Sequence, residues 1–315
     1  MGHYIFKGNA TVGAYVARCL EAAGWEGTEF AGQADAALTY CMPQGVLEDA
    51  YFESDGLIHG LRAGAVIVDL SPAPPTFARE LSALATVNDL LCVEAPLCVE
   101  DVLAADPFAD RSKIACLAAG EDDALKAAMP ILEALAGRVD RVGGPGAGQL
   151  KKAARTISEA ARLVSSIEAA ALEHATIAAS PLSAPTSGGA VEGDWPPENA
   201  SETGTFTVEM MMAEVSAAVM AGEDADLVLP QLESAMRLLD VLSVVGGVDK
   251  GPAALTLLYC DEETSTAAGL DWNRAQEVYG AALDDYDDYD DYEDDGFDGG
   301  ADGFFGGGYG RFSSN

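Results

Sequence analysis

The sequence predicts an α/β domain with a mostly parallel sheet, followed by an all-helical C-terminal domain. Short apolar runs alternate with helical patterns over residues 1–148, which is typical of a parallel sheet with helices packed on it. After Gly148 the patterns become helical, with no strong strand signal. The length of 315 residues suits two domains, and 49% apolar residues can form their cores. We therefore predict domains at 1–148 and 149–283, and a tail at 284–315.

The predicted strands of the first domain are short apolar runs bounded by Gly, Pro or charged residues. They lie at 4–6, 36–42, 65–69, 90–93, 114–118 and 138–142. Helical periodicity predicts helices at 14–23 and 122–136. This order gives strands joined by helical crossovers.

In the second domain, residues 149–179 fit one long helix, and 206–221, 228–245 and 252–258 fit shorter ones. The segment 180–204 is rich in Pro, Gly and Ser, which indicates a connection. Residues 284–315 repeat Asp-Asp-Tyr and then become rich in Gly and Phe, so we expect an acidic, disordered tail. Such a tail is either a solubilising appendage or a weak binder of a basic partner or divalent cation.

The charge balance argues against several classes of function. The chain has 17 basic and 52 acidic residues, a net charge of -35, which disfavours contact with nucleic acid or anionic membrane surfaces. No apolar run is long enough for a transmembrane helix, and the N-terminus lacks a signal-peptide pattern, so we expect a cytoplasmic protein. The six cysteines form no Cys-x-x-Cys pair and the three histidines do not cluster, so no metal site is predicted.

A glycine-containing turn follows the first predicted strand. Its pattern is Gly8-x-Ala10-x-x-Gly13, with Thr11 and Val12 before the last glycine. Such a turn at a helix N-terminus directs backbone N–H groups at a pyrophosphate, as in Rossmann-like domains. Ala10 replaces the middle glycine, which adds a methyl group at the point of closest approach.

A second glycine-rich stretch, residues 143–148, leads into the long helix. If the helix starts near Gln149, then Gln149, Lys152 and Thr156 share one face. A lysine at the base of a cleft between domains can act as a general acid or base if burial or a neighbouring cation lowers its pKa. Lys151 and Arg155 are the nearest cations. The alternative interpretation is that all three are ordinary solvated helix charges.

These motifs together resemble the β-hydroxyacid dehydrogenases, the family of 3-hydroxyisobutyrate dehydrogenase and 6-phosphogluconate dehydrogenase. The matching stretches occur in the family's order over residues 1 to 275. They are 8–24, 34–43 ending in Met42-Pro43, 68–74 with Asp-Leu-Ser-Pro, 94–100, 146–152 with Gly-Ala-Gly-Gln-Leu-Lys-Lys, and the helical stretch 206–270.

The resemblance implies a hydride transfer between NAD or NADP and a small hydroxy, carbonyl or imine substrate. Lys152 would be the catalytic acid/base. Cys98, Val99 and Thr156 would lie at the substrate. Ser71 would line the nicotinamide end of the cleft. The cofactor would also contact the residues of the glycine turn and of the loop after the second predicted strand (Gly8, Ala10, Thr11, Val12, Gly13, Met42, Pro43). The family also implies a homodimer built on helix 149–179, whose many alanines permit close packing.

Several positions depart from the family pattern. Only ten residues separate Gly24 from Asp35, where the family has a strand, a helix and a strand, so we expect a shortened first half. By count, Ala31 and Gly32 stand where a side chain would contact the adenosine ribose, with Glu29 as the nearest acid.

The substrate region departs as well. Cys98-Val99-Glu100 replaces Ser-Gly-Gly, Thr156 replaces Asn, and Ala213-Glu214 replaces Lys-Asp. Glu100 would repel an anionic acid and favour a neutral or cationic carbonyl or imine. Two hypotheses therefore stand: an NAD(P)-dependent oxidoreductase with an altered substrate, or a catalytically degenerate member acting as a binding or structural protein.

Overall fold

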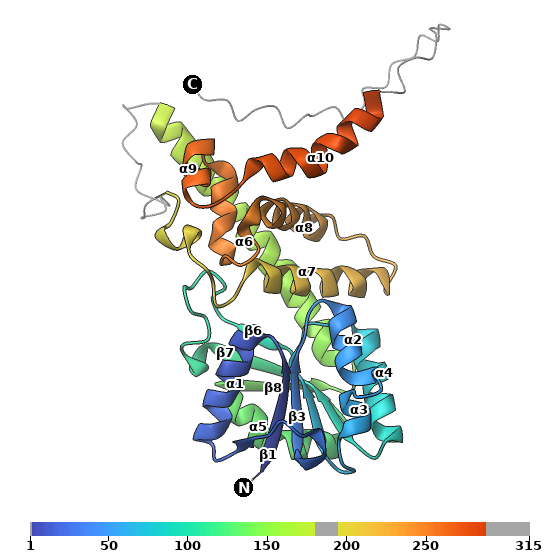
Figure 1. Cartoon of the computed structure of the whole chain (residues 1–315). Helices are drawn as coiled ribbons and strands as arrows, with labels where there is room; N and C mark the ends of the chain where they lie inside the picture. Colours follow the sequence, from blue (N-terminus) through green and yellow to red (C-terminus); the bar gives the residue numbers. More distant parts are fainter. Residues whose placement is uncertain (1, 180–194, 288–315) are drawn as a thin grey trace, which may run out of the picture.

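The chain has a sheet domain joined through one long helix to a helical domain (Figure 1). The structure is a computed structural model of the whole chain, and it describes residues 2–179 and 195–287. The helical domain lies over the end of the sheet at which the parallel strands finish. The carboxyl edge of the sheet therefore faces the second domain.

The sheet is mostly parallel, as the sequence predicts. Its strand order is β2-β1-β3-β4-β5-β7-β6, with β8 pairing β7. All pairs from β2 to β5, and the pair β7–β8, are parallel, whereas β7 runs antiparallel to β5 and β6. The strands are β1 (His3–Gly8), β2 (Glu26–Gly27), β3 (Ala36–Tyr40), β4 (Val66–Asp69), β5 (Leu91–Glu94), β6 (Leu97–Val99), β7 (Ile114–Gly120) and β8 (Arg138–Gly143).

All six predicted strands are present, and β2 and β6 are additional. These two strands have only two and three residues, too few for a periodic signal. β6 matters for the site because it makes Cys98 and Val99 part of a strand, with Cys98 opposite Ala115 on β7.

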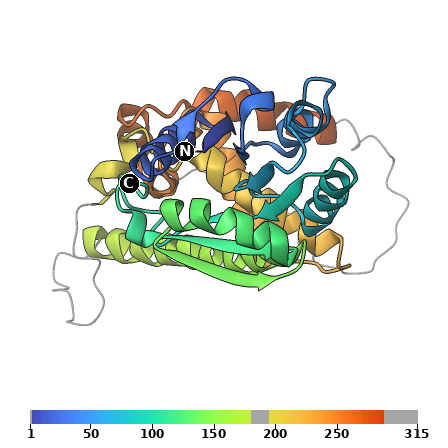
Figure 2. The same cartoon turned by 90° about the horizontal axis from the view of Figure 1, so that it is seen from below.

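Helices cover both faces of the sheet (Figure 2). On one face α1 (Ala10–Ala22) and α5 (Asp122–Leu135) share a core with Tyr4, Leu38 and Val68. On the other face α2 (Gln44–Phe52), α3 (Leu57–Gly60) and α4 (Pro75–Val87) share a core with Ile5 and Ile67. Neighbouring strand residues alternate between the two cores, as buried parallel strands require.

The first half of the sheet domain is short, as predicted. β2 pairs with His3 and Tyr4 at the start of β1, and a 3₁₀ turn, η1 (Ala31–Gln33), replaces a crossover helix before β3. α1 begins at Ala10, four residues earlier than predicted, because the side chain of Asn9 caps it.

The second domain is helical in its described residues, apart from an isolated bridge between Thr203 and Lys250. Its long helix α6 (Ala147–Ala179) packs against α7 (Val208–Glu223) and α8 (Pro230–Leu242). The remaining elements are η3 (Glu198–Ser201), a π-helical turn η4 (Ser243–Gly247), a 3₁₀ helix η5 (Pro252–Tyr259), α9 (Glu262–Ala267) and α10 (Trp272–Asp287).

Three of these helices confirm the patterns at 149–179, 206–221 and 228–245 within a few residues. The pattern at 252–258 forms the 3₁₀ helix η5. The predicted disordered tail is wrong for 284–287, which belong to α10, and its remaining residues lie outside the described part of the chain. Most of the predicted connection at 180–204 lies outside it as well.

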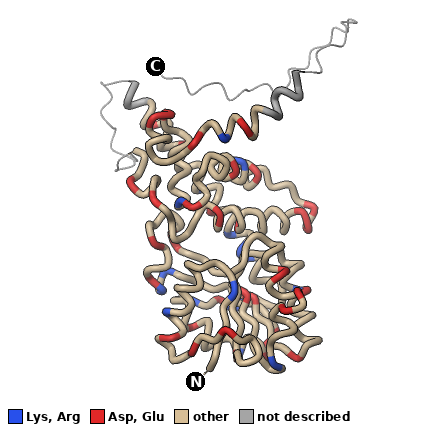
Figure 3. Tube along the Cα trace, in the orientation of Figure 1, with Lys and Arg blue, Asp and Glu red and all other residues tan. Residues whose placement is uncertain are grey.

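Acidic residues occur along the chain in both domains, and basic residues are fewer (Figure 3). Among the residues that the structure describes, no helix is long and apolar enough to cross a membrane. The same residues contain no cluster of His, Cys, Asp and Glu that could hold a metal ion.

Candidate active site

The turn between β1 and α1 has the backbone that a phosphate group requires. Gly8 has φ +131°, and a Cβ placed there would lie 2.0 Å from the Tyr40 carbonyl oxygen, so only glycine fits. Asn9 Oδ1 accepts hydrogen bonds from the backbone N–H groups of Thr11 (3.0 Å) and Val12 (3.1 Å). These two donors already converge on one oxygen. The turn therefore fits a phosphate oxygen of a dinucleotide, provided that Asn9 moves aside.

The adenosine side of the cofactor site lacks a side chain from β2. β2 ends opposite Tyr4, four residues before Gly8, which is about 13 Å along the strand. Ala31 and Gly32 lie against Gly60, at the amino edge of the sheet. The predicted equivalence of Ala31 and Gly32 with a ribose-contacting position is therefore wrong in space, because the chain turns back before it reaches the carboxyl edge.

Buried polar side chains lie at the carboxyl ends of three neighbouring strands. Thr39, Asp69 and Glu94 lie in register on β3, β4 and β5. The Thr39 hydroxyl donates to Asp69 Oδ1 at 2.9 Å and accepts from the Tyr51 hydroxyl at 2.6 Å. The Ser71 backbone N–H donates to the same Asp69 oxygen at 3.0 Å. This row orders the loop after β4.

Both acids in this row have raised pKa values. Burial raises the pKa of Asp69 to about 6, although hydrogen bonds from Ser71 and Thr39 oppose the shift. Burial also raises the pKa of Glu94 to about 7, and the nearby Asp69 charge adds to it. Glu94 Oε1 accepts from the Gly148 N–H at 2.9 Å, so this acid holds the first turn of α6.

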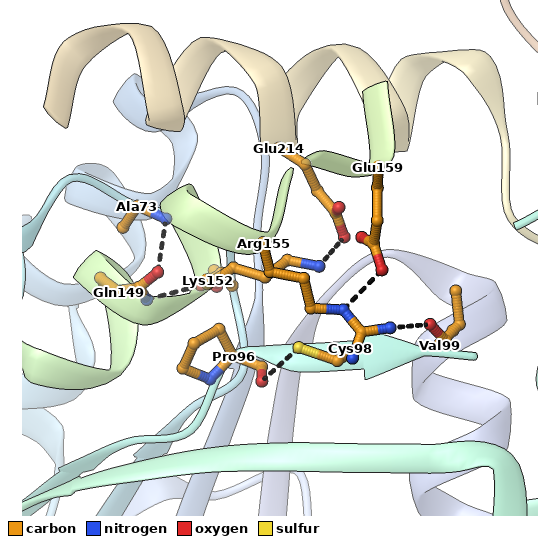
Figure 4. A network of polar contacts seen from close by, with 10 residues as sticks. Ala73, Pro96, Cys98, Val99, Gln149, Lys152, Arg155, Glu159 and Glu214 are labelled. Atoms are coloured by element: carbon orange, nitrogen blue, oxygen red, sulfur yellow. Dashed lines mark hydrogen bonds and ion pairs between the residues drawn. The ribbon is translucent and has the colours of Figure 1, made fainter. Parts of the chain in front are cut away.

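Gln149 joins α6 to the loop after β4. Its Nε2 donates to the Ser71 carbonyl at 2.8 Å, and its Oε1 accepts from the Ala73 N–H at 3.2 Å (Figure 4). The predicted shared face of Gln149, Lys152 and Thr156 is confirmed, since all three are buried. This face of α6 meets the carboxyl edge of the sheet and α7.

Lys152 forms a buried ion pair with Glu214 of α7 (Figure 4). Its Nζ lies 2.6 Å from Glu214 Oε1, and each side chain is only 5% exposed. Desolvation acts to lower the pKa of Lys152, but the charge of Glu214, with that of Glu159, outweighs it and raises the pKa above its usual value. The condition of a pKa lowered by burial or a neighbouring cation is therefore not met, because Glu214 supplies the opposite charge.

The other two cations of the glycine-rich motif behave differently from Lys152. Lys151 is exposed, as the interpretation of a solvated charge expects. Arg155 Nε contacts Glu159 at 2.5 Å, and its guanidinium also donates to the Val99 carbonyl at 2.8 Å. Arg155 thus holds β6 beside α6.

The predicted substrate residues lie around the ion pair. Cys98 is buried and close enough to Lys152, Glu214 and Arg155 to sense their charges, although burial still raises its pKa. Thr156 is buried one turn beyond Lys152, and its hydroxyl has no partner among the described residues. Glu100 follows β6 and is exposed. The acid beside Lys152 is Glu214, which the sequence marks only as a lone carboxylate within an apolar helical run.

The predicted cofactor residues outside the glycine turn lie at the ends of β3 and β4. Met42 and Pro43 follow β3 and are partly or fully exposed. Ser71 is fully buried, and its hydroxyl accepts from the Cys41 N–H at 3.0 Å. In this arrangement Ser71 supports the neighbouring loop.

Comparisons with known proteins bear on the fold and the cofactor class. The NAD-binding domain of 6-phosphogluconate dehydrogenase, as a family model, matches residues 9–144. An uncharacterized oxidoreductase of Bacillus subtilis is 26% identical over 251 residues, which are 75% of this chain and 83% of that protein. An NAD-dependent L-serine dehydrogenase of Pseudomonas aeruginosa is 27% identical over 44% of this chain and 45% of its own length.

Solved structures share the fold. The 3-hydroxyisobutyrate dehydrogenase of Mycobacterium tuberculosis, solved with L-serine, superposes with a TM-score of 0.65 at 22% identity, over 83% of this chain and 100% of that one. A 3-hydroxyisobutyrate dehydrogenase of Salmonella typhimurium gives a TM-score of 0.63 at 19% identity, over 82% of this chain and 100% of that one.

The fold and the site thus define an NAD-binding dehydrogenase of two domains. Over residues 9–144 the chain matches the NAD-binding domain of 6-phosphogluconate dehydrogenase, and over most of its length it is similar to the β-hydroxyacid dehydrogenases, with a shortened first half. The comparisons do not favour the alternative of a binding or structural protein.

Proposed function

We propose that this protein is an NAD(P)-dependent oxidoreductase that interconverts a small hydroxy compound and its carbonyl, or an amine and its imine, with Lys152 as the acid/base. The observation that carries the proposal is the buried Lys152 ammonium between the two domains, beside Cys98 and Thr156. A buried lysine whose protonation depends on one partner is suited to moving a proton.

One group of residues would bind the cofactor, and another would position Lys152. The glycine turn, through the N–H groups of Thr11 and Val12, would hold the pyrophosphate, and the loops after β3 and β4 would hold the nicotinamide end. When bound, the reduced nicotinamide supplies a hydride to the substrate carbon. Gln149 and Glu94 hold the start of α6 and thereby place Lys152.

The charges at the site indicate a substrate without net charge. Lys152 and Arg155 are matched by Glu214 and Glu159 within the same cluster. An anionic hydroxy acid would have to displace Glu214 from Lys152, which is costly in a buried site. A neutral carbonyl compound, or a zwitterion such as a hydroxy amino acid, leaves the charge balance intact.

Titration of the protein with NADH and NADPH, followed by nucleotide fluorescence, tests the cofactor. Binding of at least one of them below millimolar concentration is expected, and no binding of either would leave only the non-catalytic alternative. A panel of small aldehydes, ketones and cyclic imines then tests turnover.

Lys152→Ala tests the acid/base, with Lys151→Ala as the matched control on the exposed side of the same helix turn. Loss of a general acid lowers turnover by about 100-fold or more. The control is expected to retain wild-type turnover. Equal turnover in the two variants would remove Lys152 from this role.

We also propose that the protein forms a homodimer through α6. This helix exposes Leu150, which is 59% accessible, together with the small residues Ala154 and Ser158 on the same side. Light scattering of the wild type and of Leu150→Glu tests this, because a charge at a closely packed interface favours the monomer. A monomeric wild type would contradict it.

A further inference from the structure

The Lys152–Glu214 pair joins the two domains at the site. Lys152 comes from α6, which carries the bonds to the sheet domain, and Glu214 comes from α7. Their 2.6 Å contact is shielded from solvent, so the two charges interact much more strongly than an exposed pair would. The protonation of either group therefore depends on the other.

The groups around the pair come from three elements. Glu159 and Arg155 on α6 form their own ion pair nearby. Cys98 on β6 and Tyr40 at the end of β3 also sense the charge of Glu214. The thiol of Cys98 and the phenol of Tyr40 have raised pKa values because of burial, so both stay neutral near neutral pH. Glu214 is thus the principal charge that controls Lys152.

We propose that Glu214 holds Lys152 in its protonated form, so that the free protein is poised to donate a proton and works as a reductase of a carbonyl or imine at neutral pH. This inference rests on the proposed function and specifies its direction. Glu214 acts through Lys152 and is a positioning residue.

In the reduction, Lys152 supplies the proton that accompanies hydride uptake by the substrate carbon. An N–H bond of the Lys152 ammonium breaks as an O–H bond forms on the carbonyl oxygen, or an N–H bond on the imine nitrogen. The carbon takes up a hydride from the reduced nicotinamide. Lys152 is left as a neutral amine beside the Glu214 carboxylate, and a proton from solvent restores the pair.

Reduction and oxidation should depend on pH in opposite ways. Reduction needs the protonated lysine, and oxidation of the product alcohol or amine needs the neutral one. Burial raises the pKa of Glu214 and its charge raises that of Lys152, so the ion pair persists between these two values. Oxidation is therefore limited by the small fraction of Lys152 that is neutral. Below the pKa of Lys152 this fraction grows tenfold per pH unit.

The experiment measures kcat/KM in both directions from about pH 6 to pH 10 for the wild type and Glu214→Gln. Glu214→Gln keeps an oxygen beside Lys152 and removes the charge, so desolvation alone then lowers the pKa of Lys152. We expect wild-type oxidation to rise with pH over most of this range, and oxidation by the variant to level off at least one pH unit lower. Glu209→Gln, on the exposed side of α7, is the matched control, and Glu214→Asp is expected to restore the wild-type profile.

A second measurement on the protein without cofactor separates this inference from the proposed function. A buried lysine whose pKa is depressed makes the folded state more stable as pH rises toward its unfolded pKa, so urea midpoints of Glu214→Gln should increase with pH relative to wild type. Matching pH profiles and midpoints in the two proteins would overturn the role of Glu214. If the protein binds neither nucleotide, the proposed function is contradicted. The pH dependence of the urea midpoints would still show whether Glu214 controls the protonation of Lys152.

Discussion

Replacement of Glu94 by Gln tests a strongly perturbed acid at the carboxyl edge. Glu94 is 4% exposed, and its pKa is raised from 4.5 to about 7 by burial and by Asp69. Because the folded protein holds this proton more tightly than the unfolded chain, the stability it provides is present at low pH. It is lost as the pH rises through about 7.

The size of this loss follows from the shift. A change of one pKa unit corresponds to about 1.4 kcal/mol, so the step from 4.5 to about 7 corresponds to about 3 kcal/mol for this group. Glu94→Gln cannot ionise and still accepts from the Gly148 N–H. We expect the variant to equal the wild type below about pH 4 and to be more stable by about 3 kcal/mol near pH 8.

Urea unfolding followed by circular dichroism at these two pH values measures the difference. Glu80→Gln, an exposed position on α4, serves as the control and should show no pH-dependent change. A stability difference between wild type and Glu94→Gln that is the same at both pH values would refute the reasoning. It would mean that Glu94 is ionised in the folded protein at little cost.

Three further substitutions test the backbone geometry. Gly8→Ala forces a methyl group against a carbonyl oxygen at a positive φ and should lower the free energy of unfolding by more than about 3 kcal/mol; a thermal midpoint within a few degrees of wild type would contradict this. Asn9→Ala removes the cap of α1 and should lower the free energy of unfolding by about 1 kcal/mol. Nucleotide fluorescence should show unchanged or tighter binding. Weaker binding would show that the Asn9 side chain itself holds the nucleotide. Gln149→Leu leaves the buried backbone groups of Ser71 and Ala73 unpaired and should cost about 2 to 4 kcal/mol by urea unfolding; an unfolding midpoint equal to that of the wild type would contradict this.

Local patterns in the sequence predicted most of the fold. The six longer strands and the helices at 122–136, 149–179, 206–221 and 228–245 each carry enough residues for a periodic signal. β2 and β6 are too short for one, and α2, α3 and α4 were not predicted; they lie between the stretches that carry the resemblance. The roles of Lys152 and of the glycine turn came from motifs and remain predictions.

Contacts between distant residues decided the chemistry of the site. Gly8 must be glycine because Tyr40 approaches it, and the pKa of Lys152 is raised because Glu214 lies 2.6 Å away, 62 positions along the chain. A pKa depends on burial and on neighbouring charges, which one-dimensional spacing does not specify. The sequence by itself determined the order of strands and helices and the lysine at the domain junction. The tertiary structure decided that β2 ends short of the cofactor turn and which acid faces that lysine, because only folding brings separate segments within hydrogen-bonding distance.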